Sequence, residues 1–204
     1  MSVEATPAAQ VREATIHEEP QLRDALARAF YDDPVLSWLM PDERHRLRRL
    51  RKFFELDLRQ MAFARGTVWC NAERTGACLV MPPGAWQLPP RVAIRQAPGF
   101  LQAFGRRLPT ALALQTLMEM RHLRKPHHYV LAVGVIPERQ GSGVGSALMR
   151  PTLDQCDATG LPAYLEASSE RSAALYERLG FACHRELRLG SSPPLRLMTR
   201  PPAS

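Results

Sequence analysis

The sequence has little of what marks membrane, metal or disulfide proteins. It contains no apolar run near the roughly twenty residues that cross a bilayer. No basic and apolar leader follows Met1, so we expect neither membrane insertion nor secretion. The four cysteines are scattered and form no C-x-x-C pair, which argues against a zinc or disulfide framework in a chain long enough to build its own core. These absences favour a protein of the reduced cytoplasm.

Lysine is also scarce, because Lys52 and Lys125 are the only two lysines in a chain with 27 basic residues and a net charge of +7. Most of the densest basic cluster, residues 44–52, is arginine. It falls on a predicted helix whose other face is apolar, with Leu47, Leu50, Phe54 and Met61 at helical spacing. No aromatic residues interleave with the arginines, so we interpret the basic residues as a solvated face and expect no nucleic-acid partner.

The most informative stretch is residues 129–146, Y-V-L-A-V-G-V-I-P-E-R-Q-G-S-G-V-G-S. It predicts a buried strand, a glycine loop and a helix. Alternating glycines suit either a tight turn or a loop that approaches a phosphate at a helix N-terminus. No lysine follows the glycines, which excludes a P-loop, and Ser146 stands where the dinucleotide fingerprint needs its third glycine, although Glu166 lies at a suitable distance downstream. The pattern that fits is Q-x-x-G-x-G.

That pattern resembles the pyrophosphate loop of the GNAT superfamily of acyl-CoA N-acyltransferases. The resemblance extends to P-A-Y-L-E-A-S at residues 162–168 and to L-Y-E-R-L-G-F at residues 175–181. Within the superfamily, the residues of these motifs are most similar to those of the puromycin N-acetyltransferases. The close match covers about residues 129–200, and the N-terminal part is similar only in layout.

The predicted elements suit this resemblance. Strands that alternate with helices before a final hairpin at residues 182–189 and 195–200 predict a mixed α/β sheet. Other expectations are an edge strand at 11–16, a hairpin at 67–70 and 76–80, and helices at 92–104 and 110–124. The resemblance implies a mixed, mostly antiparallel central sheet of GNAT type with helices on both faces. We expect a flexible N-terminus at residues 1–10 and a single N-acetyltransferase domain at 11–200.

The resemblance also implies acetyl-CoA as the acyl donor and assigns residues to it. Backbone N–H groups of the loop would hold the pyrophosphate: Gln140, Gly141, Ser142, Gly143, Val144, Gly145 and Ser146. Val133, Gly134 and Val135 would pair with the pantetheine arm, with a bulge or splay near Val135. Ser172 stands where the family often has an asparagine that contacts pantetheine, and a serine offers fewer hydrogen bonds. Tyr31, Trp38 and Trp86 are candidate walls of the acceptor pocket, with burial in the core as the alternative.

Two residues could carry proton transfer. Glu166 interrupts an otherwise apolar strand, and it would accept the amine proton directly or through water. The alternative is a carboxylate paired with an arginine. Tyr176 would protonate the leaving thiolate, and its alternative is an ordinary core aromatic. His127 and His128 lack the partners of a metal site.

The sequence therefore predicts an N-acetyltransferase acting on the primary amine of a small molecule, with an aminonucleoside or amino-acid-like compound favoured. Alternatives are acetylation of protein lysines or N-termini, a non-catalytic acyl-CoA-binding module and, least favoured, a nicotinamide-dinucleotide protein. We expect a small-molecule partner and no membrane partner. The sequence leaves a homodimer open.

Overall fold

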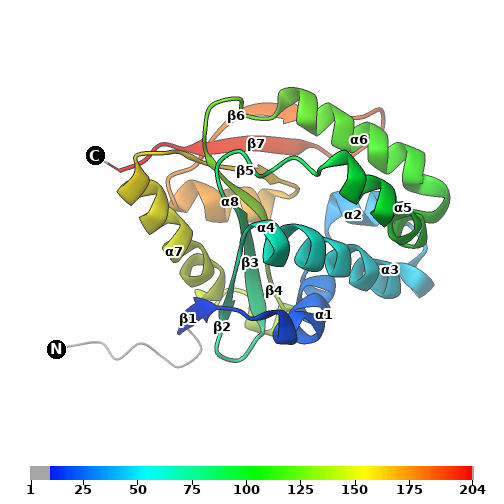
Figure 1. Ribbon diagram of the computed structural model, residues 1–204, viewed down its shortest axis with the longest axis horizontal. Helices are drawn as coiled ribbons and strands as arrows, with labels where there is room; N and C mark the ends of the chain where they lie inside the picture. The colour runs from blue at the N-terminus through cyan, green and yellow to red at the C-terminus, as the bar shows by residue number, and fades with distance from the viewer. Residues whose placement is uncertain (1–9, 204) are drawn as a thin grey trace.

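The computed structural model describes residues 10–203, and within them seven strands form one mixed sheet (Figure 1). The strands are β1 (Val11–Glu13), β2 (Thr67–Asn71), β3 (Gly76–Met81), β4 (His128–Val135), β5 (Ala163–Ala167), β6 (Ala182–Leu187) and β7 (Leu195–Arg200). Their order is β1-β2-β3-β4-β5-β7-β6, and all neighbours are antiparallel except the parallel pair β4 and β5. The predicted mixed, mostly antiparallel sheet is confirmed. The flexible segment expected at residues 1–10 lies outside the described residues, except for Gln10.

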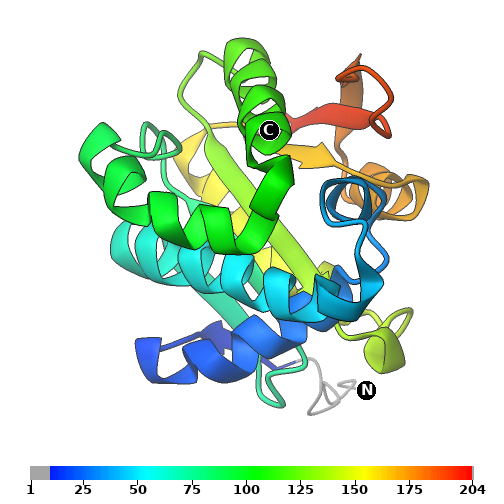
Figure 2. The same ribbon diagram turned by 90° about the vertical axis from the view of Figure 1, so that its right-hand side faces the viewer.

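Helices cover both faces of the sheet. One face carries α1 (Glu19–Ala29), α2 (Pro34–Leu39), α3 (Glu43–Leu56), the π-helix η3 (Asp57–Ala62), α4 (Phe63–Arg65), α5 (Pro90–Phe104) and α6 (Leu108–Arg121). The other face carries α7 (Val144–Thr159) and α8 (Glu170–Arg178). Figure 2 shows α1, α3 and α5 lying side by side across the first face. Three short 3-10 turns, η2 (Ile16–Glu18), η4 (Gly105–Arg107) and η5 (Pro137–Arg139), connect the elements.

Strand β3 explains why the core has two layers. All six of its residues are buried. Because side chains alternate along a strand, Ala77 and Leu79 pack toward α1 and α3, whereas Cys78 and Val80 pack toward α7. A central strand that is apolar on both faces therefore holds the two helical layers together.

The parallel strands β4 and β5 separate soon after they meet. Only two residue pairs link them, His128 with Ala163 and Tyr129 with Tyr164. The pairing of β4 with β3 is irregular between Leu79 and Val80, which face Ala132 and Val130 and leave Leu131 as the extra residue of a bulge. The bulge therefore lies at Leu131 and not near Val135, while the separation of the two strands does include Val135.

Two local expectations are corrected by the structure. The edge strand ends at Glu13 and not at Ile16, because Thr15 and Glu18 form a capping box that starts η2. The arginine face of α3 is not wholly solvated, since Arg46 is only 7% exposed and its Nε donates to the Met40 carbonyl at 2.9 Å.

Candidate functional site

The glycine loop before α7 has the geometry of an anion site. Gly141 and Gly143 have φ values of 80° and 86°, and a Cβ added at either would meet no atom within 4 Å. Positive φ favours glycine at both positions, and the open space beside them would let a ligand approach the backbone. The first helical hydrogen bond of α7 runs from the Ala147 N–H to the Gly143 carbonyl. The N–H groups of the first turn therefore have no partner within the helix and lie at its positive end.

The residues predicted to hold a pyrophosphate are not all equally available. The Gln140 N–H donates to the Pro137 carbonyl at 3.2 Å, and its side-chain amide donates to the Val135 carbonyl at 2.9 Å. Gln140 thus ties the loop to the end of β4. The Ser142 hydroxyl donates to the Arg139 carbonyl at 2.6 Å. The predicted pyrophosphate contacts of the remaining loop residues stay a prediction.

Ser172 is used by the protein itself. Its hydroxyl donates to the Ser169 carbonyl at 2.9 Å and accepts from the Ser169 N–H at 3.2 Å. These contacts form a capping box at the start of α8. The predicted Ser172 contact to a cofactor would have to compete with this cap.

The edge of β4 that faces β5 is free of strand partners from Val130 onward. Val133, Gly134 and Val135 pair with β3 on their other edge, so an extended ligand could add its own hydrogen bonds along this side. Gly134 also has a packing reason to lack a side chain, because a Cβ there would come within 3.0 Å of Phe30, Leu26 and Ala29 on and after α1. The residues present therefore fit a pantetheine arm with a pyrophosphate at the glycine loop.

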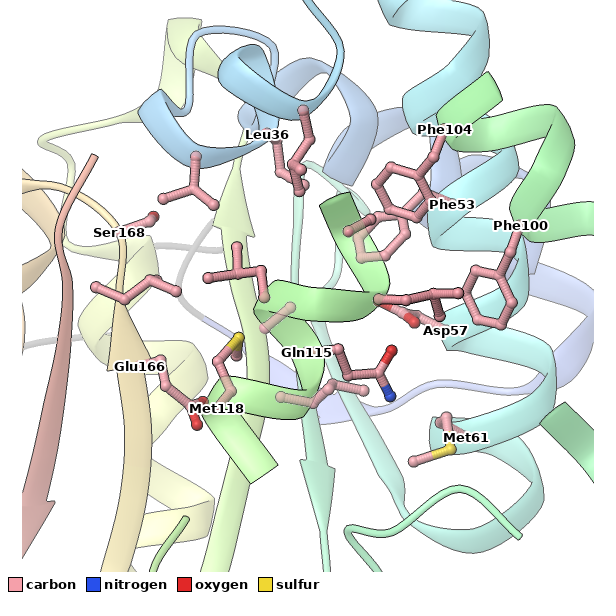
Figure 3. A pocket seen from close by; sticks show the side chains of 18 of the residues that line it. Leu36, Phe53, Asp57, Met61, Phe100, Phe104, Gln115, Met118, Glu166 and Ser168 are labelled. Atoms are coloured by element: carbon pink, nitrogen blue, oxygen red, sulfur yellow. The ribbon is translucent and has the colours of Figure 1, made fainter. Parts of the chain in front are cut away.

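A cavity of about 270 Å³ lies on the face of the sheet that carries α3, α5 and α6. We call it the central cavity. Figure 3 shows that it is lined by side chains from several helices and from β5. Leu131, Ala132 and Ser168 also line it, so it extends to the place where β4 and β5 separate.

The cavity lining carries charge of one sign. Asp33, Asp57, Glu119 and Glu166 line it, and no lysine or arginine is among its described lining residues. The rest of the lining is mostly apolar. This composition contrasts with a chain whose net charge is +7, and it favours a ligand with both apolar and cationic parts.

Of the three aromatic residues predicted as pocket walls, Trp86 lines the cavity, whereas Tyr31 and Trp38 do not. The guanidinium of Arg46 lies 5.2 Å from the Tyr31 ring centroid, and that of Arg107 lies 5.9 Å from the Trp38 ring. Both rings are therefore occupied in cation–π contacts outside the cavity. Tyr31 and Trp38 are therefore not among the lining residues of this cavity.

Glu166 lies at the cavity end of a chain of buried polar groups. Its side chain is 5% exposed, and its Oε1 lies 3.5 Å from His122 Nδ1. His122 Nε2 lies 3.0 Å from His127 Nε2, and His127 Nδ1 lies 2.7 Å from the Lys125 carbonyl oxygen. Trp86 stacks on the His122 ring with centroids 3.9 Å apart. The predicted alternative of an arginine partner does not apply, because the neighbouring side chain is a histidine.

The contacts assign the protons of this chain. A carbonyl only accepts, so His127 Nδ1 carries a proton that it donates to Lys125. Burial lowers the pKa of His127, which favours a neutral ring with Nε2 as an acceptor. His122 Nε2 must then donate to His127, which leaves Nδ1 of His122 facing Oε1 of Glu166. One proton can therefore reside between Glu166 and His122.

Two tyrosines border the carboxylate. Tyr129 and Tyr164 face each other across β4 and β5, and Glu166 lies two residues beyond Tyr164 on the same face. Burial, followed by the negative charge of Glu166, raises the pKa of both phenols. Both phenols therefore stay protonated and uncharged beside Glu166.

Tyr176 lies on the opposite side of the sheet, in the cluster formed with α7. It is 6% exposed, and burial raises its pKa, with further contributions from Cys78 and Asp33. The phenol therefore keeps its proton at neutral pH. At the end of β5, Ser168 donates a hydrogen bond to Asp33.

Sequence reasoning missed His122, Asp33 and Asp57. Asp57 gave a readable signal, because it lies three residues after Phe54 and four before Met61, on the apolar stripe of its helix. An acid on such a stripe is unusual. His122 gave none, since its pairing with His127 depends on the turn between α6 and β4. The sequence around Asp33 is that of a helix cap, and Asp33 does cap α2 through the N–H groups of Val35 and Leu36.

Two searches of the described residues gave no site of another kind. No group of three or more histidine, cysteine, aspartate or glutamate residues among residues 10–203 could hold a metal ion. In the same part of the chain, every helix is too short or too polar to cross a membrane.

Residues 99–181 match the model of the Acetyltransferase (GNAT) family. The chain is 29% identical over 196 residues to an uncharacterized N-acetyltransferase of Schizosaccharomyces pombe, a match that covers 87% of this chain and 77% of the relative. It is also 43% identical over 58 residues to mycothiol acetyltransferase of Streptomyces avermitilis, which is 27% of this chain and 19% of that protein.

Among solved structures, the chain resembles one described as histone acetyltransferase HPA2 and related acetyltransferase, from Corynebacterium glutamicum. The TM-score is 0.70 at 27% identity, and the match covers 96% of this chain and 97% of that one. The chain therefore has a GNAT-like fold and N-acetyltransferase relatives.

Proposed function

We propose that the protein is an N-acetyltransferase that moves an acetyl group from acetyl-CoA to the primary amine of a small molecule. The observation that carries this proposal is the central cavity, which is acidic in a basic chain and reaches the gap between β4 and β5. A cationic amine would be drawn into such a cavity. The GNAT-like fold and the free edge of β4 support an acyl-CoA on the other side of that gap.

In this proposal, Val133, Gly134 and Val135 hold the pantetheine arm, and the backbone of residues 141–146 holds the pyrophosphate. The bound thioester supplies an activated acetyl group. Glu166 accepts the proton of the amine and shares it with His122, whose Nδ1 lies 3.5 Å away. Tyr176 keeps a proton for the leaving sulfur, which its buried environment favours.

A small molecule is favoured over a protein as the acceptor. Residues from the segment between β3 and β4, including Trp86, Phe100 and Met118, line the cavity and cover it. Its aromatic lining would suit an aminonucleoside or an amino-acid-like amine, and puromycin belongs among the acceptors to be tested. Acetylation of a protein lysine is the second candidate, because the Corynebacterium structure is described as related to a histone acetyltransferase.

The test is acetyl transfer from acetyl-CoA to a panel of amines, amino-acid amides, puromycin and a lysine peptide, followed by thiol release and mass spectrometry. Thermal shifts with CoA and NAD accompany it. We expect stabilisation by CoA alone and turnover of small amines. Turnover of the peptide alone would make the protein acceptor the function. Binding of CoA without any turnover would indicate a non-catalytic module.

The variants Glu166→Gln and Tyr176→Phe should each lower kcat by about a hundredfold or more, with the Kd of acetyl-CoA nearly unchanged. Matched controls are Glu170→Gln, which removes an exposed carboxylate that pairs with Arg196, and Tyr31→Phe, which removes a phenol outside the cavity. Rates like those of the wild type in either catalytic variant would rule out its assigned role.

A further inference from the structure

The four carboxylates of the central cavity differ in what they contact. Asp33 accepts from two backbone N–H groups and from Ser168. Glu119 is exposed and accepts from Gln115 at 2.9 Å. Glu166 lies beside His122. Asp57 alone of the four has no side-chain hydrogen bond and no ion pair with any described residue.

Asp57 occupies an unusual place in the fold. It is the first residue of the π-helix η3, directly after α3, and π-helical turns recur at functional sites because they re-aim side chains. Its carboxyl is desolvated, and burial raises its pKa to about 7. Asp57 is partly exposed to the cavity that it lines. Its carboxylate is therefore open to a cation from outside the chain.

The surroundings suggest how such a ligand would lie. Figure 3 shows Glu166 entering the cavity from β5 and Asp57 from the far side, with Met118 and Gln115 between them in this view. Apolar side chains, among them Phe53 and Phe100, line the region near Asp57. A ligand that reaches both carboxylates would carry an apolar spacer between two polar ends.

A second polar group lies on a neighbouring element. Gln96 of α5 lines the cavity, and its side-chain nitrogen is buried without a hydrogen-bond partner. The adjacent Arg95 donates to Gln60 of η3 at 2.8 Å, so this part of α5 lies against the π-helix. Gln96 therefore adds an unpaired hydrogen-bond donor to the cavity lining, which an acceptor atom of a ligand, and not its ammonium group, would satisfy.

We propose that Asp57 binds a second cationic group of the acceptor, so that the substrate is a diamine with an apolar spacer. This inference rests on the proposed function, because it takes the first amine to be the one acetylated at Glu166. The second ammonium keeps its proton and pairs with the Asp57 carboxylate. No chemistry occurs at Asp57, which acts as a specificity-determining residue.

The test compares α,ω-diamines of three to eight methylenes with n-alkylamines in which a methyl group replaces the second amine. Binding to the full chain is measured by calorimetry without acetyl-CoA, and acetylation is measured with it. The wild type should prefer one diamine length over the matched monoamine. Asp57→Asn should weaken binding of that diamine about tenfold to a hundredfold, as loss of a charged hydrogen bond does, and should change monoamine binding less than twofold.

Two further variants keep the test decisive. Asp57→Glu retains the charge on a longer side chain and should move the preferred diamine to one methylene shorter. Glu55→Gln removes a nearby carboxylate that pairs with Lys52 outside the cavity, and should leave diamine binding unchanged. Equal binding of diamines and monoamines by the wild type, or equal losses for both in Asp57→Asn, would overturn the proposal.

The two proposals fail separately. Diamine binding that depends on Asp57, without acetyl transfer to any amine of the panel, would sustain the cation site and refute the proposed function. Acetylation of diamines and monoamines alike by the wild type and by Asp57→Asn would sustain the function and refute the cation site.

Discussion

At the scale of single residues, the pair of His122 and His127 would determine where a proton from the proposed amine acceptor goes. His122 offers Nδ1 to Glu166 only while His127 accepts from its Nε2, and the Lys125 carbonyl enforces that arrangement. In the proposed reaction His122 acts through Glu166 as a positioning residue, and it also lines the central cavity.

Replacing His122 by Asn should lower kcat by up to about a hundredfold, the lower end of what a positioned proton-transfer group contributes. The KM for acetyl-CoA should stay within twofold, because the donor lies elsewhere. Steady-state kinetics with both substrates varied would separate the two effects. A merely structural role would instead lower the amount of folded enzyme and leave kcat per folded molecule intact.

Asp57 allows a stability prediction that is independent of any activity. Burial raises its pKa from 3.8 to about 7, so between these values the folded state holds a proton that the unfolded state has lost. Stability therefore falls as pH rises from about 4 to 7, and then levels off. Above pH 7 the free energy of unfolding is lower, by on the order of a few kcal/mol, than it would be with an unshifted pKa.

Asp57→Asn should consequently raise the Tm by roughly 5 °C at pH 8, and the gain should shrink toward pH 4. Thermal unfolding of both proteins across this range would measure it. A gain that does not depend on pH would mean that the carboxyl is not desolvated in solution. If Asp57 lowers the Tm and yet strengthens diamine binding, its role is to bind the ligand and not to stabilise the fold.

At the scale of elements, α7 has glycines of positive φ at both ends, and only the first faces the proposed ligand. Gly143 and Gly160 have φ values of 86° and 66°, with open space around each. Alanine at either position should cost about 1 kcal/mol of stability through backbone strain alone.

Only Gly143→Ala should also weaken CoA binding, because its Cβ would stand where the phosphate approaches the backbone. Gly160→Ala is therefore a control for strain on the same helix. Calorimetric titration of both variants with CoA, alongside their Tm values, provides the comparison. Equal affinities would show that the glycine loop does not bind the cofactor.

The same elements show what can be predicted from the sequence. The glycine loop, the hairpin of β2 and β3, the Ser169 cap and the αL stop at Gly180 follow from local rules, and the structure contains them. Local patterns cannot say which half-buried aromatic faces a cavity and which faces a guanidinium. That distinction separates Trp86 from Tyr31 and Trp38, and it depends on how α5 and α6 return across the sheet.

At the scale of the whole molecule, the separation of β4 and β5 divides the site into two parts. The loop before α7 and Tyr176 lie on one side of the sheet, and the central cavity lies on the other. The GNAT motifs of the sequence come from the first part, whereas the second is built from helices with no motif. The sequence therefore predicted the part that we propose for the acyl donor in more detail than the part that we propose for the acceptor.

The described lining of the central cavity has no lysine or arginine, whereas the whole chain has 27 basic and 20 acidic residues. This difference in charge affects the rate at which substrates would arrive. At low ionic strength the outer field attracts a polyanionic donor and repels a dicationic acceptor. Salt screens this field beyond about 8 Å at physiological strength. As sodium chloride is added, kcat/KM should fall for acetyl-CoA and rise for a diamine. If both fell together, the outer field would not be steering the two substrates in opposite directions.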